Sequence, residues 1–132
     1  MTTRSKGRAA RILVANDVEE TRDAIEKLLV ADGYRVDPAR DERDAVDRAR
    51  RGRPDLILVS LAGRPLDVVA SAVQIRRRGR VSSAVPVVVF CLPVSEGIEA
   101  AIGDNVYITR PDSFDQLRAF LHRLLRESTR SV

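Results

Sequence analysis

The sequence has few of the residues from which metal sites, disulfides and catalytic centres are commonly built. Its 132 residues contain one cysteine, Cys91, one histidine, His122, and no tryptophan. One cysteine excludes an internal disulfide and any cysteine-rich metal site, and it fits a reducing compartment. The histidine has no accompanying pattern of cysteines or acids, so we expect it to face solvent on a helix rather than to bind a metal or take part in catalysis.

Long apolar runs are also missing. No stretch approaches the roughly 18 apolar residues of a membrane span, and residues 1–11 lack the apolar region of a secretory signal. We therefore expect no membrane association and a cytoplasmic location. With 44% hydrophobic and 32% charged residues, the chain can form a single globular core.

The excess of positive charge lies at the start of the chain. The whole chain has 23 basic and 19 acidic residues, and the basic Arg4, Lys6, Arg8 and Arg11 leave 19 of each sign in the rest. We expect residues 1–10 to form a disordered, solubilising basic tail, with an arm that binds nucleic acid as the weaker alternative. A second basic run, residues 76–80, is expected to be the solvated end of a helix.

Strands and helices alternate along the rest of the chain. Apolar, mainly aliphatic runs predict strands over residues 11–15, 56–60, 85–91 and 106–109, and the segment 34–37 is expected to form a further short strand. Apolar residues at intervals of three and four predict helices over residues 18–32, 41–51, 67–78, 95–102 and 113–126. This order predicts an α/β fold, a doubly wound five-stranded parallel sheet with five helices on its two faces. We expect one domain over residues 11–126 and a frayed end over 127–132.

The strand over residues 56–60 is central to this fold. Leu56-Ile57-Leu58-Val59 has no polar alternation, as expected for a strand that is buried on both faces. In such folds the site lies beyond the carboxyl ends of the strands. The residues expected there are Asn16, Asp17, Ser60, Cys91 and Arg110. The first two should also cap the helix that follows them.

Five segments together resemble a known family, the receiver domain of two-component response regulators. They are ILVAND (12–17), GYRV (33–36), PDLILVSL (54–61), PVVVFC (86–91) and YITRP (107–111). The resemblance covers residues 11–126 and implies a CheY-like, flavodoxin-like three-layer sandwich. The segment between Cys91 and Arg110 is a few residues short for this family, so the fourth helix should be abbreviated.

The family's phosphoryl-transfer site is changed at most of its positions. The resemblance implies an acidic pair that holds Mg²⁺, an acceptor aspartate, and a Ser or Thr and a Lys that contact the phosphoryl group. This sequence keeps Asp17, but has Asn16 in the pair, Ser60 for the acceptor, Cys91 for the Ser/Thr and Arg110 for the Lys. A serine cannot form an acyl phosphate and adds no charge to a metal site. We therefore expect no aspartate phosphorylation and no bound Mg²⁺ or other cofactor.

Two smaller hypotheses concern the side chains of this degenerate pocket. An ion pair between Asp17 and Arg110 could take the place of the metal. Cys91 could be read as a redox sensor, because a nearby arginine lowers the pKa of a thiol. A buried small residue at the end of a strand is the simpler interpretation of Cys91.

The resemblance then predicts a pseudo-receiver, a signalling module that is not an enzyme and that acts by binding another protein. A kinase, a regulator or an output protein is the expected partner, and a homodimer remains an open alternative. The surface that the resemblance implies includes Tyr107, Gln116 and Arg123. A second hypothesis is a small-ligand sensor that uses the crevice near Ser60 and Arg110. A third is nucleic-acid binding through the basic tail.

Overall fold

A computed structural model describes residues 9–90, 99–103, 105–109 and 114–130. Six strands form one sheet in the order β3-β2-β4-β5-β7-β6. The strands are β2 (Arg11–Asn16), β3 (Arg35–Ala39), β4 (Leu56–Ser60), β5 (Val87–Phe90), β6 (Glu99–Gly103) and β7 (Val106–Thr109). The helices are α1 (Glu19–Ala31), α2 (Glu42–Gly52), α3 (Pro65–Arg78) and α4 (Phe114–Arg130). The predicted α/β fold with five parallel strands is confirmed.

Alternate side chains of the central strands supply two separate cores. Leu13, Ala15, Ile57 and Val59 face α2 and α3, and they pack with Ala45, Ala49, Ala72 and Ile75 of those helices. Ile12, Val14, Leu56 and Leu58 face the opposite side, where α1 contributes Ile25 and Leu29 and α4 contributes Leu117 and Leu121. The side chains of Leu56, Ile57, Leu58 and Val59 are all fully buried. Because successive residues of a strand point to opposite faces, the uninterrupted aliphatic run of β4 requires helices on both sides.

The helices begin and end where local chemistry directs them. Asp41 caps α2, since its carboxylate accepts a hydrogen bond from the Asp44 amide at 2.8 Å. Glu19 and Glu20 lie in the first turn of α1, where the helix dipole favours negative charge. Just beyond α1, Gly33 has φ of 97°, a left-handed backbone that glycine adopts at little cost.

The prediction of a helix over residues 95–102 is wrong where the structure describes that segment. Residues 99–103 form β6, which pairs antiparallel with β7 and makes the sheet six-stranded. Residues 95–98 lie outside the described residues, which contain four helices rather than the expected five. Ala100 and Ala101 favour a helix by intrinsic propensity, so pairing with β7 overrides the local preference of this segment. An antiparallel edge strand satisfies the backbone groups of this segment by pairing with β7 instead.

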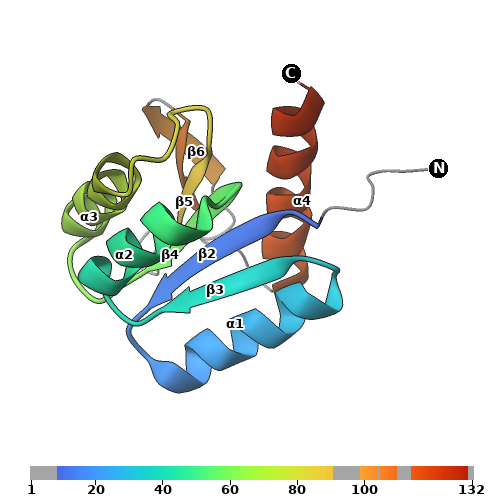
Figure 1. The fold of residues 1–132 in the computed structure, drawn as a ribbon, viewed down its shortest axis with the longest axis horizontal. Helices are drawn as coiled ribbons and strands as arrows, with labels where there is room; N and C mark the ends of the chain where they lie inside the picture. The colour runs from blue at the N-terminus through green and yellow to red at the C-terminus, as the bar shows by residue number, and fades with distance from the viewer. Residues whose placement is uncertain (1–8, 91–98, 104, 110–113, 131–132) are drawn as a thin grey trace.

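The last helix differs from the others in its direction. Figure 1 shows α1 running along β2 and β3, whereas α4 stands steeply across the start of β2. Its buried residues are Leu117, Phe120, Leu121, Leu124 and Leu125. The helix continues to Arg130, four residues beyond the expected boundary at 126. Ser113, the first residue of the expected helix, lies outside the described residues. No described helix is long and apolar enough to cross a bilayer.

The basic run at the end of α3 is not solvated throughout, which corrects the expectation for residues 76–80. Arg76 is 7% exposed. Its Nη1 donates hydrogen bonds to the carbonyl oxygens of Val85 at 3.0 Å and Asn105 at 3.3 Å. The guanidinium therefore joins the end of α3 to the segments that precede β5 and β7.

We predict that Arg76→Ala lowers the free energy of unfolding by about 3 kcal/mol, because it leaves two carbonyl oxygens without their charged donor. Urea denaturation of the two proteins measures the difference. Arg77→Ala is the matched control, since Arg77 is the exposed next residue, and it should cost less than about 0.5 kcal/mol. A loss below about 1 kcal/mol for Arg76→Ala would contradict this role.

Candidate functional site

The carboxyl ends of the parallel strands define the candidate site. Asn16 ends β2 and Ser60 ends β4, and the two residues are directly paired in the parallel register of these strands. Asp17 follows β2 immediately. The structure thus brings together three of the five residues expected in the pocket. Cys91 and Arg110 lie outside the described residues, so their placement stays a prediction.

Asn16 is almost entirely enclosed, with 3% of its surface exposed. Its side-chain Oδ1 accepts a hydrogen bond from the Val18 amide at 2.8 Å, and its backbone oxygen accepts one from Arg22 Nη1 at 2.9 Å. The expectation that Asn16 or Asp17 caps α1 is wrong, because Val18 occupies the cap position and no side chain caps it. Asn16 instead stabilises the turn between β2 and α1.

Asp17 is exposed, and its carboxylate connects two loops of the site. Its Oδ2 accepts a hydrogen bond at 3.0 Å from the backbone amide of Ala62, a residue of the loop that follows β4. One oxygen of the carboxylate is therefore bound to backbone next to Ser60. The proposed ion pair with Arg110 stays a prediction.

Ser60 is half-buried and contributes a neutral hydroxyl to this edge. Asn16, its partner across the strands, is neutral as well. Asp17 carries the one formal charge among these three residues, whereas hard cations such as Mg²⁺ prefer several oxygen ligands with negative charge. Among the described residues, no group of three or more His, Cys, Asp or Glu is placed to hold a metal ion.

The side chains expected to form an interaction surface gather around Phe120. Tyr107 is half-buried and packs edge-on against the Phe120 ring, with centroids 5.8 Å apart. Its hydroxyl donates to Asn105 Oδ1 at 3.0 Å. The exposed Arg123 places its guanidinium carbon 5.0 Å from the centre of the same ring. Gln116 lies one turn before Phe120 on α4 and is half-buried.

A polar cluster that the sequence did not reveal joins α1 to α4. Arg118 binds both carboxylate oxygens of Asp32, through Nε at 2.6 Å and through Nη2, and it also reaches Asp115 at 2.9 Å. His122 is exposed as expected, but its Nδ1 lies 3.2 Å from the Tyr34 hydroxyl. These residues line an open depression of about 430 Å³.

The electrostatics of this cluster follow from its contacts. The hydrogen bond from Arg118 lowers the pKa of Asp32. Burial raises the pKa of Tyr34, and the nearby Asp32 charge acts in the same direction. No signal in the sequence could have found the Asp32–Arg118 pair, because 86 residues separate its members.

Sequence comparison with known proteins identifies relatives of this chain. No protein-family model matches the sequence. The response regulator MprA of Mycolicibacterium vanbaalenii is 32% identical over 124 residues, which is 90% of this chain and 52% of that protein. The MprA of Mycobacterium bovis is 30% identical over 125 residues. The chain belongs to the receiver domains of response regulators. It spans about half the length of these curated relatives.

Solved structures of receiver domains share the fold. A CheY-like receiver domain from Methanospirillum hungatei superimposes with a TM-score of 0.73 at 13% identity, over 95% of this chain and all of that one. The response regulator TrrA from Thermotoga maritima, in complex with Mg²⁺-BeF, gives 0.64 at 19% identity, over 87% and 98%. At these identities the likeness establishes the fold alone.

We predict that Asp17→Ala in this receiver domain speeds hydrogen exchange at the Ala62 amide, because the amide loses its acceptor. Asp17→Asn should retain most of the protection, since its amide oxygen can still accept the bond. NMR-detected exchange at Ala62 measures both, with the buried Leu58 amide of β4 as the internal reference. Equal exchange rates in the wild type and Asp17→Ala would show that the bond does not order this loop.

Proposed function

We propose that this receiver domain acts as a signalling module that binds a protein partner without phosphorylation of an aspartate and without Mg²⁺. It would not be an enzyme, and we place it in the cytoplasm. One observation carries the proposal: two neutral side chains, Asn16 and Ser60, lie side by side in register at the ends of β2 and β4.

The chemistry of these side chains supports the proposal. Phosphorylation of an aspartate produces an acyl phosphate, which requires a carboxylate at the acceptor position. A serine hydroxyl becomes a useful nucleophile only beside a general base. Asp17 is the nearest acid in the chain after β2, and one of its oxygens is already bound to the Ala62 amide. Mg²⁺ prefers several charged oxygen ligands, whereas Asp17 would offer one carboxylate.

The surface around Phe120 supports a binding role. Tyr107 and Arg123 contact Phe120 from a strand and from a helix, so their positions are fixed by packing. Aromatic and arginine side chains held in this way are typical of residues that dominate protein interfaces. We propose a kinase, a regulator or an output protein as the partner, and we place its contact at Tyr107, Gln116 and Arg123.

We predict that the chain gains no phosphoryl group when it is incubated with acetyl phosphate and Mg²⁺. Intact-mass spectrometry under conditions that preserve acyl phosphates gives the measurement. A receiver domain with a complete acidic site, treated in parallel, shows that the reagent is active. An increase in the mass of this chain by one phosphoryl group would overturn the proposal, and Ser60→Ala would show whether Ser60 carries it.

We predict that Arg123→Glu weakens binding of a protein partner by at least about tenfold, since the charge that packs on Phe120 is reversed. Quantitative crosslinking in cells, followed by affinity measurement with the purified partner, tests this. Arg126→Glu is the matched control, because Arg126 is also exposed and lies on the same helix. Equal affinity of the wild type and Arg123→Glu for every partner recovered would place the interface elsewhere.

A further inference from the structure

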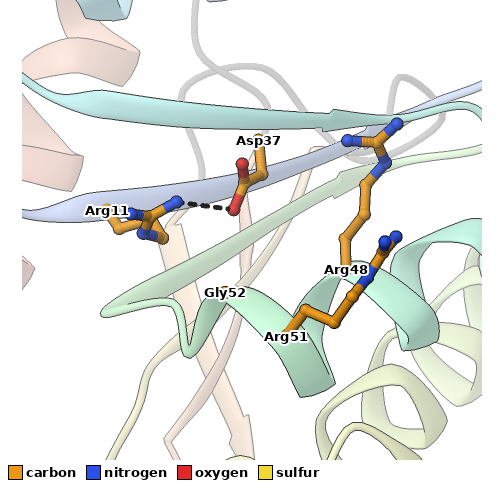
Figure 2. A pocket seen from close by; sticks show the side chains of 5 residues that line it. All are labelled: Arg11, Asp37, Arg48, Arg51 and Gly52. Carbon is orange, nitrogen blue, oxygen red and sulfur yellow. Dashed lines mark hydrogen bonds and ion pairs between the residues drawn. The ribbon is translucent and has the colours of Figure 1, made fainter.

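A second depression lies between β2, β3 and α2, away from the site at the carboxyl ends of the strands. It has a volume of about 300 Å³ and is lined by Arg11, Asp37, Arg48, Arg51 and Gly52. Figure 2 shows the Asp37 carboxylate drawn between Arg11 on one side and the long side chains of Arg48 and Arg51 on the other. Three guanidinium groups from two different elements therefore border one hollow.

The arginines keep donors that no described acceptor uses. Arg11 binds Asp37 through Nη1 at 3.1 Å, and Arg48 binds Asp44 through Nε at 3.1 Å. Arg51 makes one long contact, from Nε to the Asp47 carbonyl oxygen at 3.5 Å. No carboxylate of the described residues lies within ion-pair distance of Arg51. Since a guanidinium has five N–H donors, most of those around this hollow remain available to a ligand.

The charges of the residues that line the hollow do not balance, because three arginines and one acid, Asp37, line it. Outside the lining, Asp44 pairs with Arg48 and Asp55 accepts a hydrogen bond from the Arg11 backbone amide. A helix dipole accounts for basic residues in the last turn of α2. It does not account for Arg11, which begins a strand and points to the same hollow.

Gly52 keeps the floor of the hollow open. A Cβ atom at this position would lie 2.5 Å from Asp37 Oδ2 and 3.5 Å from the Arg11 side chain. Any larger residue would therefore displace the Arg11–Asp37 pair. The close approach of the α2 backbone to this pair is what places Arg48 and Arg51 beside Arg11.

We propose that this hollow binds a phosphate group, either free phosphate or the phosphate of a small phosphomonoester. A phosphate offers several oxygens, which match the paired N–H donors of guanidinium groups in two-pronged hydrogen bonds. The volume of the hollow exceeds what a phosphate needs, so part of an ester fits as well. Asp37 holds Arg11 in place, and the anion binds on the side of Arg48 and Arg51.

NMR titration of the full ¹⁵N-labelled chain tests the proposal. Inorganic phosphate and glycerol phosphate are added in separate experiments at constant ionic strength, with chloride as the reference anion. We expect saturable shifts of the Gly52 and Arg53 amides with one or both phosphates. Arg51→Ala should weaken that binding by at least about tenfold, the loss of one charged hydrogen-bonding partner.

Arg43→Ala is the matched control, because Arg43 is exposed on the same helix and does not line the hollow. It should bind phosphate as the wild type does.

Tighter binding of glycerol phosphate than of phosphate would identify an ester as the natural ligand, and the reverse would identify free phosphate. Shifts that do not saturate, that chloride reproduces, or that are the same in Arg51→Ala would overturn the proposal. Unchanged amide signals of β4 in each variant confirm that the fold is intact.

Discussion

The parallel pairing of β2 with β4 is the constraint on which the rest of the structure depends. Both strands are buried, so their backbone groups must bond within the sheet and their side chains must be covered on two faces. The two cores and the four described helices follow from that requirement. The same register places Asn16 opposite Ser60, so the pairing that stabilises the fold also sets the composition of the site.

Much of the fold was predictable because its signals are local. The aliphatic runs of β2, β4 and β5 and the apolar intervals of α1 and α4 have the periods of their secondary structures. Asp41 and Gly33 mark helix ends through interactions within a few residues. The adjacency of Asn16, Asp17 and Ser60 was predictable as well, since the carboxyl ends of neighbouring parallel strands must meet. The resemblance to receiver domains was recognisable from five short segments that follow this same order.

The features that could not be predicted depend on contacts between distant parts of the chain. Arg76 looked like part of a solvated run, but it donates hydrogen bonds to the carbonyl oxygens of Val85 and Asn105, which only the fold brings near it. Asp32 meets Arg118 across 86 residues. The strand β6 was read as a helix because a short segment of small residues has no decisive period, and pairing with β7 determines its conformation. The bond from Ala62 to Asp17 likewise joins two loops that only the sheet brings together.

The neutral pair at the edge of the sheet also has a consequence for stability. Two buried or half-buried carboxylates in this place would repel each other, and each would lose hydration, unless a cation offset them. Asn16 avoids that cost because it is uncharged and its amide oxygen is satisfied by the Val18 amide. Asp17 keeps its charge at the exposed position, where water and the Ala62 amide stabilise it. This charge distribution lets the edge fold without a metal, and it gives a physical reason why a receiver scaffold would persist under the loss of phosphoryl-transfer chemistry that we propose.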